Sequence, residues 1–202
     1  MAGRIVVLIS GSGTNMEALA ESCASGEVTG EIAAVVADRD CLGLRAAEKR
    51  EIPTSTIEPR DFGSRDEWSD KLKDVVAGYE PDLVVSAGFM RILGPSFVDA
   101  FKGKLINLHP SLLPAFPGAH GPRDALAHGA KVTGTTVHLI DREVDHGPII
   151  LQEAVRIEQN DTEDSLHERI KKVEHRLLPH ACRLMLEGRV RVQDGRVVVD
   201  QD

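Results

Sequence analysis

The chain has 202 residues, of which 42% are hydrophobic and 28% are charged, and its formal net charge at pH 7 is -8. These values predict one soluble globular domain without a membrane-spanning helix, because no apolar run approaches the roughly 18 residues that such a helix needs. The acidic charge argues against a nucleic-acid partner, which would require many Lys and Arg contacts to phosphates.

The amino terminus and the cysteines bear on where the protein works. Residues 1–4 lead directly into the apolar run 5–9, which is too short for a secretory signal. The three cysteines are an odd number without paired spacing, which argues against a disulfide framework and against a thiolate zinc site. We therefore expect a cytoplasmic protein whose cysteines are small, partly buried side chains.

The first half of the chain alternates short apolar segments with helical patterns. We expect strands at residues 5–9, 32–37, 53–57, 83–87 and 105–108. We expect helices at residues 16–23, 42–50, 64–76 and 95–101. Ser64 and Glu67 have the spacing of a capping box at the start of the third helix. Apolar strands separated by helices predict a parallel sheet covered on both faces, the doubly wound α/β fold.

The pattern changes after the Pro- and Gly-rich stretch 110–122. Residues 132–140 and 149–157 alternate as strands joined by a polar loop, which predicts antiparallel pairing. A long helix is expected at 162–187, kinked or divided at Pro179, and then a hairpin at 190–199. We therefore predict a single α/β domain over residues 1–202, doubly wound, with a mostly parallel sheet and antiparallel strands in the C-terminal half.

A glycine-containing loop, Gly11-Ser12-Gly13-Thr14-Asn15, follows the first strand and opens a helix. Backbone N–H groups and the positive end of the helix dipole converge there on a position suited to a phosphate. Met16 stands where a dinucleotide fingerprint has its third glycine, and no P-loop lysine follows. A plain strand-to-helix turn is the alternative, but ligands of open α/β sheets bind at this edge.

Asn107 and His109 lie two residues apart at the end of a buried strand, so their side chains point to the same side. An amide donor beside an imidazole suits a carbonyl that becomes a tetrahedral oxyanion. The alternative is that both side chains only satisfy loop carbonyls. Asp145 is the candidate acid beside the histidine, and Asp141 and Glu143 are rivals by chemistry.

Metal binding is a second alternative, and the histidines that would supply ligands are His109, His120, His138 and His146. None of them forms a pair at ligand spacing on one helix, and no Cys or Asp cluster supports them. We therefore expect no metal site. His138 is expected to pack or to form hydrogen bonds within its strand.

Taken together, these motifs are similar to those of the phosphoribosylglycinamide formyltransferases, a family of folate-dependent enzymes. The resemblance covers nearly the whole chain, and it is carried by residues 11–15, 87–93, 107–114, 135–138, 145–148 and 173–175. It implies that 10-formyltetrahydrofolate donates its formyl group to the amine of 5-phosphoribosylglycinamide. No metal or nucleotide cofactor takes part, and the partners are small molecules, with a homodimer left open.

The resemblance also implies roles for individual residues. The implied catalytic residues are Asn107, His109 and Asp145. The implied acceptor-binding residues are Gly13, Thr14, Asn15, Met16 and Glu174. The implied folate-binding residues are Arg65, Met90, Arg91, Ile92, Leu93 and Asn107. Residues 1–108 would then form the phosphate-binding half, and residues 109–202 the folate and catalytic half.

The chain departs from the family pattern in two places. His146 follows the implied catalytic acid where many relatives have a small residue, and the segment 119–123 differs, which leaves His120 and Arg123 without an assigned role. Three other functions compete: a formyltetrahydrofolate hydrolase, a tRNA formyltransferase and a non-catalytic metabolite-binding module. The chain length favours the single-domain enzyme over the first two, and the acidic charge disfavours tRNA.

Overall fold

The computed structural model describes residues 2–200. A seven-stranded sheet runs through it in the order β3-β2-β1-β4-β5-β6-β7. Its strands are β1 (Gly3–Ile9), β2 (Gly30–Ala37), β3 (Thr54–Thr56), β4 (Leu83–Ser86), β5 (Leu105–His109), β6 (Val132–Leu139) and β7 (Ile149–Arg156). Strands β1 to β5 are parallel, whereas β6 and β7 pair antiparallel. The predicted doubly wound α/β fold with a mixed sheet is confirmed.

Helices cover both faces of the sheet. They are α1 (Thr14–Ala24), α2 (Leu42–Glu48), α3 (Arg65–Ala77), α4 (Pro95–Ala100), α5 (Gly121–His128) and α6 (Glu163–Leu186). Alternate residues of β1 face opposite sides, because side chains of a strand alternate with period two. Ile5, Val7 and Ile9 join the core under α1, α2 and α6, while Val6 and Leu8 join the core under α3 and α4.

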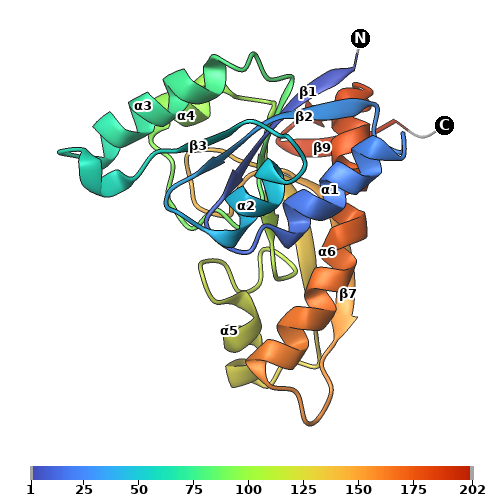
Figure 1. Ribbon diagram of the computed structural model, residues 1–202. Helices are drawn as coiled ribbons and strands as arrows, with labels where there is room; N and C mark the ends of the chain where they lie inside the picture. The colour runs from blue at the N-terminus through green and yellow to red at the C-terminus, as the bar shows by residue number, and fades with distance from the viewer. Residues whose placement is uncertain (1, 201–202) are drawn as a thin grey trace.

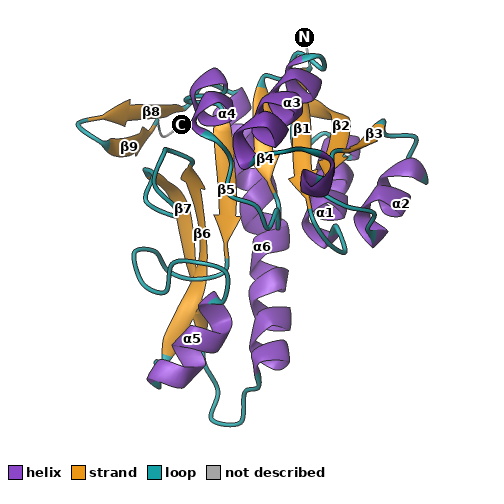
Figure 2. Ribbon diagram, turned by 90° about the vertical axis from the view of Figure 1, so that its left-hand side faces the viewer, coloured by secondary structure: helices purple, strands orange, loops and turns teal. Residues whose placement is uncertain are grey.

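The antiparallel strands extend beyond the parallel part of the sheet. Figures 1 and 2 show β6 and β7 continuing past the end of β5, accompanied by α5 and the first half of α6. A small apolar cluster holds this extension together, with Leu166 and Ile170 of α6 packed against Val155 of β7 and Leu126 of α5. The end of β5 therefore lies in the angle between the parallel sheet and this extension.

Three elements differ from the sequence prediction. Pro179 does not divide the long helix, because α6 runs unbroken through it for 24 residues and buries ten of them. A proline inside a helix costs about 3 kcal/mol, and burial of this apolar face offsets that cost. Helix α5 and a short 3₁₀ turn, η1 (Pro59–Asp61), lie in segments without a predicted helix.

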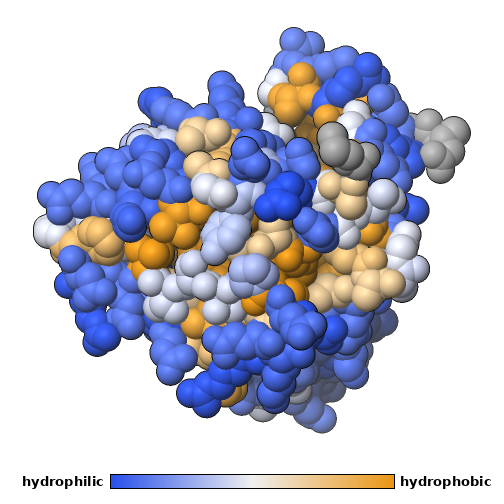
Figure 3. Space-filling view, turned by 45° about the horizontal axis from the view of Figure 1, so that its top comes forward, coloured by the Kyte–Doolittle hydropathy of each residue, from blue (hydrophilic) through white to orange (hydrophobic). Residues whose placement is uncertain are grey.

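The remaining predicted elements are confirmed with small changes in their ends. The C-terminal hairpin consists of β8 (Val190–Gln193) and β9 (Arg196–Val199), and its turn residues Asp194 and Gly195 both have positive φ. The first half of the predicted capping box at α3 is present, since Ser64 Oγ accepts from Glu67 N at 3.1 Å, but Glu67 Oε2 accepts from Gly63 N at 3.1 Å and not from Ser64 N. No helix within residues 2–200 has the length and apolarity to span a bilayer. The face in Figure 3 is mostly hydrophilic, with apolar patches between charged side chains.

Candidate active site

The glycine loop of residues 11–15 forms an open helix N-terminus at the edge of the sheet where the parallel strands end. Gly13 has φ 77° and precedes α1, and a Cβ there would lie 2.6 Å from Cα of Gly43. The first intrahelical bond runs from Glu17 N to Gly13 O. The N–H groups of Thr14, Asn15 and Met16 therefore precede the hydrogen-bonded ladder and point toward the loop, as an anion site requires.

Met16 contributes to this site only through its backbone. Its side chain is fully buried in the core under α1. Asn15 turns its amide inward, and its Nδ2 donates to Oε2 of Glu174 at 2.9 Å. The side-chain oxygen of Asn15, Oδ1, is buried and has no hydrogen-bond partner within residues 2–200. A buried acceptor without a partner is uncommon in proteins, so this oxygen is suited to a donor group of a ligand.

Glu174 connects the glycine loop with the strand that ends in His109. It lies in the middle of α6 and is 4% exposed, and burial raises the pKa of its carboxyl group. The hydroxyl of Thr135 connects the two: its Oγ1 lies 3.5 Å from Oε1 of Glu174 and 3.1 Å from the backbone oxygen of His109. Asn15 and Glu174 were both predicted to bind the acceptor, and the structure brings them into contact.

Lys171 is a residue that the sequence analysis did not single out. It lies three positions before Glu174 on α6, and this spacing places both side chains on one helix face. Its charge lowers the pKa of Glu174 and thereby opposes part of the effect of burial. In the sequence, the spacing of three residues from Glu174, which was predicted to bind the acceptor, was the feature that could have pointed to Lys171.

His109 and Asp145 lie side by side although 36 residues separate them in the chain. Nδ1 of His109 is 3.5 Å from Oδ2 of Asp145, and both side chains are nearly buried. Nε2 of His109 is 2.9 Å from the backbone oxygen of Phe116. Each ring nitrogen thus faces an oxygen acceptor, and a protonated imidazole can donate to both.

Asn107 reaches Asp145 through His138. The antiparallel register pairs Asn107 directly with His138, and Nδ2 of the amide lies 3.2 Å from Nε2 of the imidazole. Nδ1 of His138 lies 2.9 Å from the Leu139 carbonyl oxygen, so this nitrogen carries the proton. Burial lowers the pKa of His138, and its neutral Nε2 then accepts from the amide of Asn107. Oδ1 of Asp145 is 3.8 Å from the same nitrogen.

His138 therefore belongs to the site, beyond its expected place within a strand. Because Nε2 of His138 accepts from Nδ2 of Asn107, the nitrogen of that amide must face His138. One N–H of the amide is used in this bond, and the second N–H is available to a ligand. The structure brings the three predicted catalytic residues together in a row: Asn107 contacts His138, His138 lies 3.8 Å from Asp145, and Asp145 lies 3.5 Å from His109.

Two loops hold Asp145 in position. Its backbone has φ 53°, which is uncommon for a residue other than glycine, and Oδ2 accepts from Gly118 N at 2.7 Å. The rival acids face elsewhere: Asp141 binds Nδ1 of His146 at 3.1 Å, and Glu143 lies 4.0 Å from the same nitrogen. Among the three candidate acids, Asp145 is the one in contact with His109.

The predicted folate segment 90–93 follows β4. Met90 is 62% exposed and Ile92 is 58% exposed, whereas Leu93 packs against the core under α3. The segment is fixed at its start by Met90 N, which donates to Ser10 Oγ at 2.8 Å. Two exposed apolar side chains on a fixed loop offer a surface for a flat aromatic ligand.

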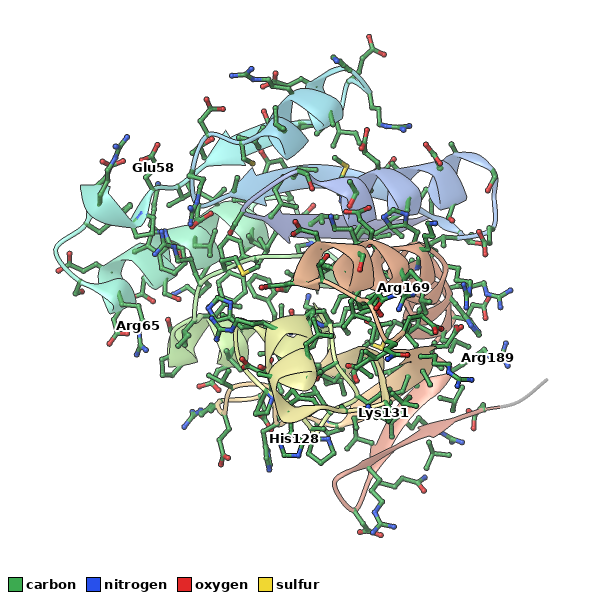
Figure 4. All side chains as sticks on the ribbon, turned by 90° about the horizontal axis from the view of Figure 1, so that it is seen from below. Glu58, Arg65, His128, Lys131, Arg169 and Arg189 are labelled. Atoms are coloured by element: carbon green, nitrogen blue, oxygen red, sulfur yellow. The ribbon has the colours of Figure 1, made fainter. Side chains whose placement is uncertain are left out.

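Arg91 belongs to this loop, whereas Arg65 lies on α3. Nε of Arg91 donates to the buried carboxylate of Asp38 at 2.6 Å. Arg65 is the first residue of α3, and Ser69 of the same helix accepts from Gly94 N at 2.8 Å. Figure 4 shows Arg65 at the outer end of its helix, away from His128 and Lys131. Arg65 donates to Asp66 and Arg91 to Asp38, and the folate roles of both arginines remain predictions.

The histidines named above as possible metal ligands do not gather into one cluster in the described residues. No group of three or more His, Cys, Asp or Glu side chains within residues 2–200 is placed to hold a metal ion. His120 and Arg123, which had no assigned role, are both exposed at the start of α5.

The chain resembles known proteins over most of its length. Residues 3–182 match the family described as formyl transferase. A phosphoribosylglycinamide formyltransferase of Mycobacterium tuberculosis is 50% identical over 175 residues, which cover 87% of this chain and 81% of the relative. The structure of glycinamide ribonucleotide transformylase 1 from Symbiobacterium toebii superposes with a TM-score of 0.96 at 43% identity, covering 98% of this chain and 93% of that one.

A formyltetrahydrofolate deformylase from Pseudomonas syringae has the same fold, with a TM-score of 0.91 at 30% identity, and the match covers all of this chain and 67% of that one. The family match spans both the glycine loop and the residues around His138. The chain belongs to the formyl transferase family.

Proposed function

We propose that the protein transfers the formyl group of 10-formyltetrahydrofolate to the amine of 5-phosphoribosylglycinamide, a step of purine biosynthesis. The observation that carries this proposal is the contact of Asn107, His138, Asp145 and His109 at the sheet edge where the glycine loop lies. The similarity to named phosphoribosylglycinamide formyltransferases at up to 50% identity supports the choice of substrates.

Direct attack of the amine on the formyl carbon accounts for the residues in the site. The nitrogen lone pair forms the new C–N bond, and the carbonyl electron pair moves to the oxygen, which becomes an oxyanion. The available N–H of Asn107 and a protonated His109 then stabilise this oxyanion, and one such donor is typically worth about 2.7 to 4 kcal/mol. Collapse of the intermediate breaks the bond to the folate nitrogen, which gains one proton as it leaves, while the attacking nitrogen gives up one proton, so the transfer consumes no net proton.

Proton donation by His109 requires an exchange of hydrogen-bond partners. Nδ1 faces Asp145, so Nε2 is the nitrogen left for the substrate, and here it contacts the Phe116 carbonyl oxygen. Phe116 itself has φ 54°, a strained conformation for an aromatic residue. A substrate oxygen that displaces this carbonyl replaces one acceptor of Nε2 by another.

The acceptor site follows from the glycine loop and α6. The phosphate would be bound by the backbone N–H groups of residues 14–16, with Lys171 as a nearby cation. The ribose hydroxyls would bind Glu174, and the unpartnered amide oxygen of Asn15 is placed to accept from the same ligand. Binding both substrates side by side supplies much of the rate, up to roughly 7 to 11 kcal/mol in the best-oriented models.

Acceptor dependence separates this proposal from its nearest rival. The deformylase fold match favours, as second candidate, hydrolysis of the same folate by water. We would follow release of deformylated folate spectroscopically with and without phosphoribosylglycinamide. Turnover that requires the glycinamide and yields its formylated product supports the transferase, whereas equal turnover without it would establish the hydrolase. Binding of both ligands without any turnover would indicate a binding module.

A further inference from the structure

The first turn of α2 lies directly against the glycine loop of residues 11–15. Gly43, the second residue of α2, is buried, and its backbone N–H donates to the carbonyl oxygen of Gly11 at 3.0 Å. Figure 1 shows α2 beside the loop that leads from β1 into α1. A helix that is distant in the sequence therefore takes part in setting where this loop lies.

The two backbones approach more closely than a side chain would permit. A Cβ at Gly43 would lie 3.0 Å from Cα of Gly13, 3.1 Å from the carbonyl oxygen of Gly11 and 2.6 Å from Cδ1 of Ile9. Carbon atoms in ordinary van der Waals contact are about 3.5 to 4.0 Å apart. A side chain at position 43 must therefore displace a neighbour, and two of its three nearest neighbours are backbone atoms of the loop.

The loop is held less firmly than the helix. Leu44 and Ala47 anchor α2 in the core that it shares with α1 and α6. Gly11 and Ser12, in contrast, are exposed. A collision at position 43 is thus relieved by movement of the loop, and the movement needed is a few tenths of an ångström.

The hydrogen bond from Gly43 also orients a peptide group of the loop. The carbonyl oxygen of Gly11 faces α2, and in a planar trans peptide the N–H that follows points the opposite way. The N–H of Ser12 is therefore directed away from α2, where it can join those of residues 14–16 in binding an anion. Rotation of this peptide would turn a carbonyl oxygen toward the anion and would repel it.

We propose that Gly43 is a positioning residue of the acceptor site, which holds the glycine loop where its N–H groups converge on the phosphate. It acts through the loop and not through contact with a substrate. The inference rests on the proposed function, because it takes the loop to bind the phosphate of phosphoribosylglycinamide. It extends the acceptor site to α2, an element without a part in the proposed transfer reaction.

Gly43→Ala tests the inference by steady-state kinetics with both substrates varied. Its added methyl group should raise KM for phosphoribosylglycinamide about tenfold, because a misplacement of about 1 Å in a site can cost about 100-fold and the shift here is smaller. KM for 10-formyltetrahydrofolate and kcat at saturation should stay within about twofold, since α2 packs against α1, β2 and β3.

Ile9→Val/Gly43→Ala separates displacement of the loop from strain in the core. Valine lacks Cδ1, so the double variant loses the 2.6 Å clash and keeps the close contacts with Gly11 and Gly13. The acceptor KM should stay raised while Tm recovers toward that of Ile9→Val. Return of this KM to the unmodified value would overturn the inference, because strain at Ile9 would then be the cause. The double variant also serves if Gly43→Ala does not fold.

Gly78→Ala is the matched control. Gly78 lies at the C-terminal end of α3 with φ -61°, and a Cβ there would lie 3.4 Å from the Val75 carbonyl oxygen, which is an ordinary contact. The same substitution at this position should leave both KM values unchanged. An unchanged acceptor KM in Gly43→Ala, or an equal rise in Gly78→Ala, overturns the inference.

Binding of inorganic phosphate is read separately, as Kd from a phosphorus NMR titration of the unmodified protein and of Gly43→Ala. Weaker phosphate binding by the variant, without transfer to phosphoribosylglycinamide by either protein, would refute the proposed function and support the inference. Transfer with the same acceptor KM in both proteins would refute the inference and leave the proposed function intact. An unmodified protein that neither binds phosphate nor transfers formyl groups would refute both.

Discussion

Asp145→Asn tests the pairing of His109 with its acid most directly. The substitution keeps the size of the side chain and an oxygen that can accept from Gly118 N, but it removes the negative charge 3.5 Å from Nδ1 of His109. At that distance, with an effective dielectric constant of about 20, the attraction between an imidazolium and a carboxylate is roughly 5 kcal/mol. Water and the remaining amide dipole reduce the net loss, and we expect kcat to fall about 10²- to 10⁴-fold.

The assay is steady-state formyl transfer with both substrates varied. Asp145 contacts neither the glycine loop nor residues 90–93 in the described part of the chain, so both KM values should stay within about fivefold of those of the unmodified protein. Asp141→Asn is the control, because Asp141 lies in the same loop but faces His146. Asp145→Asn with raised KM values and an unchanged kcat at saturation would refute the reasoning, as would an equal kcat loss in Asp141→Asn.

Three further predictions concern other parts of the molecule. Glu174→Gln should raise KM for the acceptor about 10- to 100-fold with little change in kcat, because Gln has one acceptor oxygen where Glu174 has two and so cannot accept from both Asn15 and a ligand hydroxyl; initial rates check this, and a pure kcat effect would contradict it. Asp38→Asn should lower the free energy of unfolding by about 1 to 3 kcal/mol in urea titrations, and an unchanged midpoint would contradict the role of that carboxylate. The hydrogen bond to Asp141 raises the pKa of His146 above its unfolded value. The stabilisation that this ion pair gives the folded protein is therefore complete below about pH 6.5, and it is lost as the pH rises through the folded pKa. Tm measured against pH should lose this dependence in His146→Ala.

Much of the fold followed from periodicity in the sequence. Continuous apolar runs such as 5–9 and 83–87 predicted buried parallel strands, and alternation at 132–140 and 149–157 predicted the antiparallel pair. Helix α5 was missed because its first residues, Gly121 and Pro122, are also typical of loops, and eight residues give too short a pattern. In hindsight, a proline in the first turn and Gly129 after the last one mark both ends of a helix.

The site was predictable in part. Asn107 and His109 share one side of a strand by period alone. The residues alone named Asp145 as the candidate acid with two neighbouring acids as rivals, the resemblance supported that choice, and the contact with His109 shows which acid is near. The contact of His138 with Asn107 was not predicted, because it depends on the register between β5 and β6, which no local pattern specifies. Pro179 shows the opposite case: local propensity predicted that the helix would be kinked or divided there, and α6 is not divided, because its packed face continues through the proline.

The direct pairing of Asn107 with His138 has a consequence for how the activity responds to changes in the sheet. A slip of one residue between β5 and β6 would turn Asn107 away from His138 and would also expose Leu108, Val137 and their neighbours, which pack in the core. Catalytic alignment and the apolar interior are thus set by the same strand register. Loss of turnover on mild denaturation would therefore report the opening of these two strands, which makes the enzyme's own reaction a local probe of folding.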